Sequence, residues 1–397
     1  MQIFSIKKVF KYCITSAVIV GSSASLLFSA PSDEMMAGSV KLSNGKTMYF
    51  RLYVPKNIST DKRYPLVMCL HGIGERGSDN RAQVDREDMA RQWSFDSVKT
   101  KYSPFVLYPQ CPADDEWVNY MGNGRDGKSA PAAVGAIKVI DSLINKYPID
   151  TTRLYVGGLS WGGMGTQGIL MTYPNKFAAA FPCASMNTVY TGSILKQTPF
   201  WAWHGSNDPT VNVSGSKNLC SAVEKEGEKV VRFVSGKEMS NPSGISVDSL
   251  KKAVVAGANF LYSEVTGGDH GAGWHEAFYS PILVPWLMSK SKVNGKTVTS
   301  WPPQGPSSAS TQTTEKLNKF QVSGTFQVAN RKILWQSFSN FPASLAIFNA
   351  KGSIVKQYTV QSKQGEVTCT ELPSGVYVAK FNVSGMFSSG QTLVIAQ

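Results

Sequence analysis

Runs of consecutive apolar residues alternate with segments of helical periodicity between residues 40 and 290. Four runs have the two-sided apolar character of strands buried in a parallel sheet: Tyr64–Leu70, Phe105–Pro109, Phe177–Cys183 and Pro199–Trp203. After the second run, Ala132–Tyr147 carries its apolar residues on one helical stripe. Strands that alternate with helices predict an α/β fold with a mainly parallel sheet.

Further segments complete this domain. Val40–Val54 alternates polar and apolar residues around an Asn-Gly pair, which predicts an opening β-hairpin. Val84–Trp93 is expected to be helical. Lys229–Val234 and Phe260–Val265 are expected to be the last two strands.

The pattern changes after residue 291. Residues 292–315 are rich in Pro, Ser and Thr and have no periodicity, so we interpret them as a linker. Residues 316–397 show short β runs separated by Asn, Gly and Ser turns, which predicts a small all-β sandwich. These runs are Lys332–Ser337, Ser344–Asn349, Ile354–Thr359, Glu366–Leu372, Val376–Asn382 and Gln391–Ala396. The α/β domain is then expected over residues 38–291.

The N-terminus has the layout of a secretory signal peptide. Lys7, Lys8 and Lys11 precede an apolar, small-residue stretch from Ile14 to Ala30. This stretch is too short and too rich in Ser and Gly for a membrane span. We therefore expect residues 1–30 to be a signal peptide, the mature form to have no integral membrane span, and the protein to be secreted or held at the cell surface.

The net charge and the cysteine content limit the kinds of partner and cross-link that we expect. The formal net charge of +13 falls to about +10 without the three leader lysines. Scattered lysines that keep the protein soluble account for this charge, and attraction to acidic polysaccharide or a membrane surface is the alternative. The chain has no basic run interleaved with aromatics and no zinc-finger spacing, so we expect no nucleic-acid partner.

The six cysteines of the chain, one of them in the leader, are too sparse for a disulfide framework, although export permits one or two bridges.

A G-x-S-x-G motif lies at the centre of the α/β domain. Gly158, Ser160 and Gly162 follow the β-type run Arg153–Val156 and precede an apolar stretch that ends near Pro174. This order of strand, sharp turn and helix is that of a nucleophile elbow, in which a strained turn pushes the serine Oγ out of the sheet. The motif therefore predicts a nucleophilic serine.

Two later loops supply an acid and a base. A serine hydroxyl needs a base to take its proton, and an acid to orient that base. Asp208 follows the strand that ends at Trp203, and His270 follows the strand that ends at Val265. The order Ser, Asp, His is that of α/β-hydrolases. His275 is the alternative base and Asp269 the alternative acid, while His71 and His204 are expected to anchor loops.

The remaining chemistry concerns the oxyanion and the substrate. The N–H of Trp161 and one from Gly72 or Ile73 are candidates for an oxyanion hole. Trp117, Trp161 and Trp274 are expected near the site, where aromatic faces could stack on a sugar or an aromatic acyl group. For Trp117 and Trp161 a role in filling the core is an equal alternative. No H-E-x-x-H motif or third ligand accompanies the histidines, so we expect no metal.

Taken together, these motifs resemble an exported esterase family, the feruloyl-esterase and polyhydroxybutyrate-depolymerase-like ("predicted peptidase") branch of the α/β-hydrolases. The resemblance covers about residues 40–290. It rests on Leu70–Asn80, Pro109–Pro112 with Trp117, the elbow, His204-Gly205 with Asp208, and His270 with Trp274. Two features depart from the family: the gap between His270 and Trp274 is longer than is usual, and residues 229–257 look inserted.

The resemblance implies the roles of individual residues. It implies a Ser160–Asp208–His270 triad and an oxyanion hole at Ile73 and Trp161. The substrate-binding residues that we expect on the same basis are Gln110, Trp117 and Trp274. It also implies acyl-enzyme chemistry without a cofactor, on acetyl or feruloyl esters of plant cell-wall polysaccharide. The tail, through Leu372–Val378 and Leu393–Ala396, resembles the C-terminal sorting domains of bacterial secretion systems, which implies secretion machinery as a partner.

The sequence thus predicts a secreted serine carboxylic-ester hydrolase that acts on polysaccharide or on a small acylated ester. A serine peptidase and a polyhydroxyalkanoate-type depolymerase are alternatives within the same chemistry. A polysaccharide-binding surface protein on an inactive hydrolase scaffold is the alternative from another functional class. For the tail, the alternative to a sorting domain is a carbohydrate-binding or spacer sandwich.

Overall fold

The computed structural model describes residues 30–120, 125–235 and 247–308 of the α/β region and its C-terminal extension. In the tail it describes residues 325–329, 332–336, 343–349, 353–360, 364–383, 386–387 and 391–395. The predicted signal peptide lies almost entirely outside the described residues. In the described part of the chain, no helix is both long enough and apolar enough to cross a membrane.

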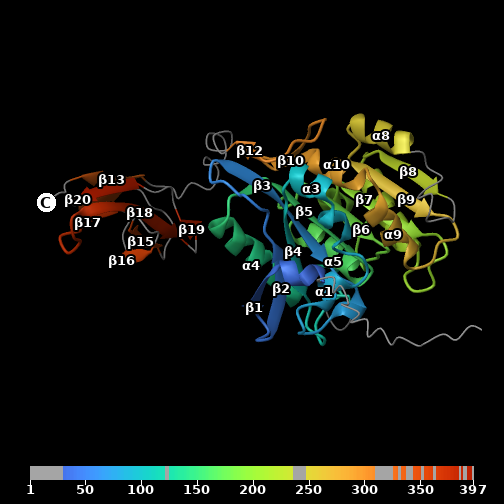
Figure 1. Cartoon of the computed structure of the whole chain (residues 1–397), viewed down its shortest axis with the longest axis horizontal. Helices are drawn as coiled ribbons and strands as arrows, with labels where there is room; N and C mark the ends of the chain where they lie inside the picture. Colours follow the sequence, from blue (N-terminus) through green and yellow to red (C-terminus); the bar gives the residue numbers. More distant parts are fainter. Residues whose placement is uncertain are drawn as a thin grey trace, which may run out of the picture.

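The α/β domain is built on one sheet of ten described strands (Figure 1). Its order is β1-β2-β4-β3-β5-β6-β7-β9-β8, with β12 paired to β3. The strands are β1 (Met36–Lys41), β2 (Thr47–Tyr53), β3 (Lys62–Leu70), β4 (Phe105–Gln110), β5 (Ile149–Leu159), β6 (Ala179–Cys183), β7 (Phe200–Gly205), β8 (Val230–Ser235), β9 (Phe260–Val265) and β12 (Ser307–Ser308). From β4 to β8 the neighbours pair in parallel, whereas β1 and β2 form the antiparallel hairpin expected from the sequence. The predicted α/β fold is confirmed.

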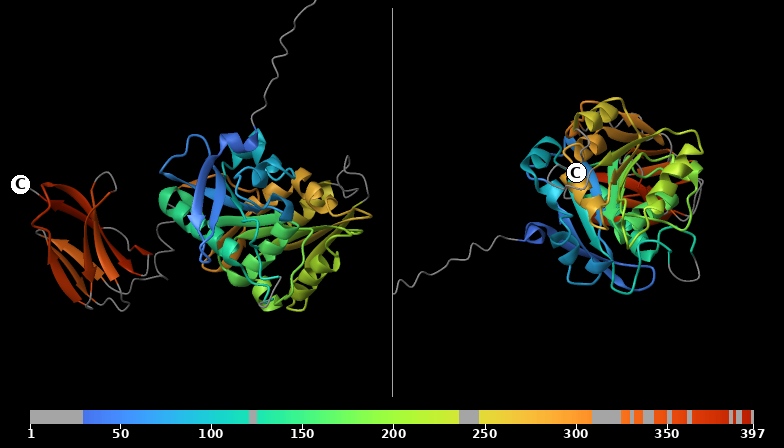
Figure 2. Two further views of the ribbon diagram at one scale, coloured as in Figure 1. Left: turned by 90° about the horizontal axis from the view of Figure 1, so that it is seen from below. Right: turned by 90° about the vertical axis from the view of Figure 1, so that its right-hand side faces the viewer.

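Helices cover both faces of this sheet (Figure 2). Successive side chains of a strand point to opposite faces, so Leu66 and Met68 of β3 join one core while Val67 and Cys69 join the other. The first core is closed by α4 (Pro131–Lys146), α5 (Trp161–Thr172), α6 (Gly192–Leu195) and α7 (Ser214–Glu224). The second is closed by α1 (Ala82–Asp85), α2 (Arg91–Ser94), α3 (Asp96–Lys101), α8 (Val247–Val255), α9 (Ala272–Tyr279) and α10 (Leu283–Met288). Burial on both faces explains why the strands are continuously apolar.

The predicted helix Val84–Trp93 is wrong as a single element. The structure has the one-turn helices α1 and α2 there, and the chain between them passes through Glu87 and Asp88 at φ 55° and 53°. Left-handed backbone at two successive residues interrupts the right-handed helix.

The boundary of the predicted linker is also wrong. Residues 290–299 form the hairpin β10 (Lys290–Val293) and β11 (Lys296–Thr299), and β12 follows at residues 307–308. The Nζ of Lys290 is buried and donates to Gly257 O, Asn259 Oδ1 and Thr299 Oγ1. These bonds tie the hairpin to the α/β domain, although the sequence there lacks an apolar pattern. Residues 309–315 lie outside the described residues.

The tail is all β, as predicted. Its described strands form two antiparallel sheets, one of three strands and one of five. The first contains β13 (Thr325–Ala329), β14 (Lys332–Gln336) and β17 (Gln364–Thr368). The second contains β15 (Ala343–Phe348), β16 (Ile354–Val360), β18 (Gly375–Val383), β19 (Met386–Phe387) and β20 (Gln391–Ile395). The five cysteines after the leader are all free and buried, so the one or two bridges that export permits do not form among them.

Candidate active site

Ser160 lies at the sharp turn between β5 and α5. Its backbone has φ 52° and ψ −116°, a conformation that costs a non-glycine residue about 1–3 kcal/mol. The flanking glycines allow the turn to sit against the end of β3, because a Cβ on Gly158 or Gly162 would lie 2.4 or 1.9 Å from Leu70 O. The side chain of Ser160 is held at the edge of the sheet where the parallel strands end.

Two other strand ends bring an acid and a base to the same edge. The Nε2 of His270 lies 2.8 Å from Ser160 Oγ, and its Nδ1 lies 2.7 Å from Asp208 Oδ2. The carboxylate side chain of Asp208 is fully buried, whereas the His270 side chain is 21% exposed. The three predicted residues therefore form one continuous hydrogen-bonded chain. Asp269 instead caps the start of α9 by accepting from the N–H groups of Gly271 and Ala272.

The loops that carry Asp208 and His270 are held together by hydrogen bonds from main-chain N–H groups, one to a carbonyl and one to a serine hydroxyl. Asn207 N donates to Gly268 O over 2.9 Å, and Gly267 N donates to Ser206 Oγ over 2.6 Å. A Cβ on Gly205 would lie 2.1 Å from Asp269 O, so only glycine permits this approach. These bonds make the separation of acid and base a property of the backbone.

The electrostatics favour an ionised acid. Burial alone would raise the pKa of Asp208, but the hydrogen bonds from His270, Val211 and Thr210 outweigh it and hold this pKa below its usual value. The N–H groups of Thr210 and Val211 lie 2.8 and 2.9 Å from Asp208 Oδ1. The carboxylate is therefore a fixed negative charge that can orient the imidazole of His270 and stabilise it when protonated.

The two predicted oxyanion donors are the first residues of a helix and of a 3-10 turn beside Ser160. Trp161 is the first residue of α5, and Ile73 is the first residue of the 3-10 helix η2 (Ile73–Glu75). The first N–H groups of a helix have no acceptor inside it. A Cβ on Gly72 would lie 3.8 Å from Ser160 Cβ, which places the start of η2 next to the serine. Both N–H groups are suited to meet negative charge that develops close to Ser160 Oγ.

Gln110 and Trp117 lie beneath the site, not on its surface. Both side chains are 0% exposed. Gln110 accepts from Asn80 N and donates to Glu75 O and Asp79 Oδ1, and Trp117 Nε1 donates to His71 O. This location corrects the expectation of direct substrate contact. In the structure the two side chains instead hold the loop that follows β3.

Trp274 and His275 flank His270. The Trp274 ring meets the His270 ring edge-on with centroids 4.9 Å apart, and its side chain is buried. The Nδ1 of His275 lies 3.8 Å from Asp88 Oδ2, whereas the imidazole bonded to Ser160 Oγ is that of His270. The geometry thus favours His270 over His275 as the base, and Trp274 supports the base from one side.

Two histidines that the sequence assigned to loop anchoring are indeed buried at strand ends. His71 accepts from Cys111 N and contacts Gly72 O, which ties the loop after β3 to the end of β4. His204 does more than anchor a loop, because its Nε2 also lies 3.2 Å from Asp208 Oδ2. Sequence reasoning missed this contact. The sequence does hint at this contact, because His204 lies near the end of β7 and four residues before Asp208.

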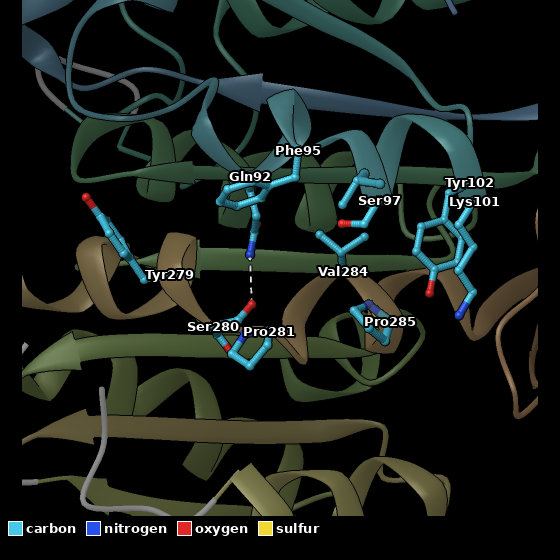
Figure 3. Close-up of a pocket in the computed structure, with 11 residues that line it drawn as sticks. Gln92, Phe95, Ser97, Lys101, Tyr102, Tyr279, Ser280, Pro281, Val284 and Pro285 are labelled. Carbon is cyan, nitrogen blue, oxygen red and sulfur yellow. Dashed lines mark hydrogen bonds between the residues drawn. The ribbon is translucent and has the colours of Figure 1, made fainter. Parts of the chain in front are cut away.

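A cavity of about 420 Å³ lies on another part of the domain, between α2–α3 and α9–α10 (Figure 3). Phe95, Tyr102 and Tyr279 line it together with Gln92, and the Nε2 of Gln92 donates to Ser280 O. Ser160, Asp208 and His270 are not among its lining residues. The cavity is therefore separate from the hydrogen-bonded chain.

An elbow serine, an acid after β7 and a histidine after β9, all at one edge of a parallel sheet, define an α/β-hydrolase. A crystal structure of a thermostable esterase matches this chain with a TM-score of 0.55 and 29% identity, covering 66% of this chain and 64% of that one. This similarity agrees with the fold described above.

Sequence relatives agree as well. The bifunctional acetylxylan esterase/xylanase XynS20E of Neocallimastix patriciarum is 26% identical over 183 residues, which are 43% of this chain and 23% of the relative. Poly(3-hydroxyalkanoate) depolymerase C of Paucimonas lemoignei is 26% identical over 244 residues, 53% of this chain and 56% of the relative. Fungal acetylxylan and feruloyl esterases are further relatives. The chain spans less than two thirds of the length of each of these proteins. The resemblance expected from the sequence is confirmed.

The tail has a match of its own. Residues 322–396 match the family described as the secretion system C-terminal sorting domain. This match confirms the sorting-domain interpretation of the tail. It also confirms the expected location of the protein outside the cell, either secreted or at the cell surface.

Proposed function

We propose that the chain is a secreted serine carboxylic-ester hydrolase that removes acetyl or feruloyl groups from plant cell-wall polysaccharide. The observation that carries this proposal is the hydrogen-bonded chain from Ser160 through His270 to Asp208, with 2.8 and 2.7 Å between the bonded atoms. A nucleophile, a base and an orienting acid are then within reach of one another in the order that acyl transfer requires.

The proposed reaction proceeds in two halves. Ser160 Oγ attacks the ester carbonyl carbon while its proton passes to His270 Nε2, which gives a tetrahedral intermediate. The C–O bond to the sugar then breaks, the leaving oxygen takes the proton from His270, and the acyl group stays on Ser160. In the second half, water gives a proton to His270 and attacks the acyl-enzyme. The carboxylic acid leaves and Ser160 regains its proton.

Main-chain N–H groups of the protein stabilise the negative charge on the tetrahedral intermediate in this mechanism. In the tetrahedral state the former carbonyl oxygen is negative, and we assign as its donors the N–H groups of Trp161 and Ile73, the first residues of α5 and η2. Each such donor typically contributes about 3 kcal/mol to the transition state. Asp208 stabilises the imidazolium of His270 during both halves, and no bound cofactor is required.

The choice of substrate follows from the relatives and from the tail. Relatives named as acetylxylan and feruloyl esterases support an acylated xylan as the substrate. We further propose that secretion machinery recognises the sorting domain at residues 322–396, which would place the enzyme where plant polysaccharide is found.

Two assays test the proposal. Purified protein is expected to hydrolyse p-nitrophenyl acetate, and Ser160→Ala is expected to lower the rate by at least about 10³-fold. Acetate and ferulate released from xylan are then measured by chromatography beside cleavage of a peptide library. Release of either acid without peptide cleavage supports a polysaccharide esterase, whereas peptide cleavage alone would make the protein a serine peptidase. Binding to xylan without any hydrolysis would make it a binding protein.

A second candidate keeps the same mechanism with another ester. Similarity to a poly(3-hydroxyalkanoate) depolymerase over 244 residues favours a polyester as the alternative substrate. Clearing of a poly(3-hydroxybutyrate) suspension, with no acid released from xylan, would select this candidate.

A further inference from the structure

His204 is a fully buried side chain that touches the acid of the proposed triad. Its Nε2 lies 3.2 Å from Asp208 Oδ2 and 2.9 Å from Val211 O, and its Nδ1 lies 2.7 Å from Ser216 Oγ. The side chain is 0% exposed. Packing also holds the backbone at this point, since a Cβ on Gly273 of α9 would lie 3.0 Å from His204 Cα. The ring therefore has a single orientation.

The neighbours of the ring define which nitrogen carries the proton. A main-chain carbonyl such as Val211 O only accepts, so Nε2 must be a donor. Burial lowers the pKa of His204, which favours a neutral ring. A neutral ring with its proton on Nε2 has a lone pair on Nδ1, which accepts the hydroxyl proton of Ser216. Asp208 and His270 are the titratable groups that act on this ring.

The donor that results completes the hydrogen bonding of Asp208. A carboxylate has about four lone-pair sites. Thr210 N and Val211 N fill the two on Oδ1, and His270 Nδ1 fills one on Oδ2. The Nε2–H of His204, which donates to Val211 O, also faces the fourth site, with Nε2 3.2 Å from the same oxygen that orients the base. Without it, this buried oxygen would lose one of the two contacts that fix its direction.

We propose that His204 is a positioning residue for the hydrolysis proposed above: its Nε2–H, in a ring held by Val211 O and Ser216 Oγ, is shared with the Asp208 carboxylate and keeps Oδ2 facing His270 Nδ1. The hydrogen-bonded chain then has five members, Ser216, His204, Asp208, His270 and Ser160. His204 acts through Asp208 and does not touch the reacting atoms, so the inference rests on the proposed function.

The test compares three variants in p-nitrophenyl acetate hydrolysis. Loss of a hydrogen bond to a charged group predicts that His204→Leu lowers kcat by about 10- to 100-fold with KM little changed. His204→Gln places an amide donor near the position of Nε2 and is expected to restore kcat to within roughly 5-fold of the wild type. Ser216→Ala leaves Nδ1 without its buried partner, so the ring is held less firmly, and is expected to cost roughly 3- to 10-fold.

The pH profile separates positioning from a structural role. With one donor fewer on Asp208, its charge favours the protonated form of the base more strongly. The acid limb of kcat/KM is therefore expected to move to higher pH in His204→Leu and to return in His204→Gln. Tyr155→Phe is the matched control, because it removes another buried hydrogen bond, to Lys290 O, from the strand that leads to Ser160. It is expected to lower Tm without moving the acid limb.

Several results would overturn the inference. One is a His204→Leu protein with kcat and acid limb unchanged. Another is a His204→Gln protein as impaired as His204→Leu, which would show that ring shape matters and the donor does not. If His204→Leu does not fold, the Ser216→Ala variant becomes the test. An unchanged kcat in Ser216→Ala would refute the positioning role of His204. Wild-type protein that hydrolyses no ester, or Ser160→Ala that keeps full activity, would instead refute the proposed function itself.

Discussion

The Nε2 of His270 lies 2.8 Å from the Oγ of Ser160, although 110 residues separate the two in the sequence. This contact exists because β5 and β9 both end at the same edge of the sheet, and because each strand passes directly into a loop that carries the functional side chain. Short main-chain bonds between the β7 and β9 loops then fix the position of the base relative to Asp208.

Gly162→Ala is expected to disrupt the elbow. The added methyl group would lie 1.9 Å from Leu70 O, a main-chain atom that cannot rotate away. Shifting the start of α5 from β3 is expected to cost about 3 kcal/mol or more and to abolish ester hydrolysis. Thermal unfolding and p-nitrophenyl acetate turnover measure the two effects. Gly74→Ala is the control, since no atom lies within 4 Å of the added Cβ, and near-normal stability is expected for it.

Ser160→Gly is expected to make the protein more stable while removing its activity. Glycine adopts φ 52° and ψ −116° without the steric cost that a serine bears there. A gain of about 1 kcal/mol in the free energy of unfolding is expected from urea denaturation, and Ser160→Ala should show no such gain. Equal stability of the two variants would mean that the turn is not strained.

Glu276→Gln is expected to change stability in a pH-dependent way. Burial raises the pKa of Glu276 to about 7. A carboxyl group whose pKa is raised by folding contributes stability below its unfolded pKa, and this contribution is lost as pH rises to the folded value. The variant should therefore match the wild type near pH 4 and exceed it by about 1–2 kcal/mol at pH 8. A difference that does not depend on pH would contradict this reading.

Arg153→Met is expected to release the segment that leaves the α/β domain. The guanidinium group is paired with the buried Asp150 over 2.7 Å and donates to Gln304 O and Gly305 O. Breaking a buried ion pair from one side is expected to cost about 3–5 kcal/mol and to expose residues 304–305 to protease. Lys176→Met removes a partly exposed pair with Asp141 and should cost less than about 1 kcal/mol. Limited proteolysis followed by mass spectrometry distinguishes the two variants.

The sequence predicted the elements that have a strong local pattern. The strands buried on both faces were evident as apolar runs, and Ser160, Asp208 and His270 were identified because each follows such a run. The carboxyl ends of parallel strands share one edge of a sheet, so position after a strand indicates proximity in space.

Other features depend on contacts that no local pattern records. Gln110 and Trp117 also follow a strand, but the sequence does not show which way a side chain points, and both turn into the protein. Residues 292–308 lack apolar periodicity, and their order comes from polar contacts such as those of Lys290 and Arg153. The contact of His204 with Asp208 likewise becomes visible only once the two loops are folded together.

In the proposed mechanism His270 and Asp208 make Ser160 a nucleophile. Labelling with a fluorophosphonate, followed by mass spectrometry of the peptides, measures this nucleophilicity residue by residue. One adduct is expected, on Ser160, formed at least about 100-fold more slowly in His270→Ala and absent in Ser160→Ala. Labelling of another residue, or of Ser160 at the same rate without His270, would contradict it.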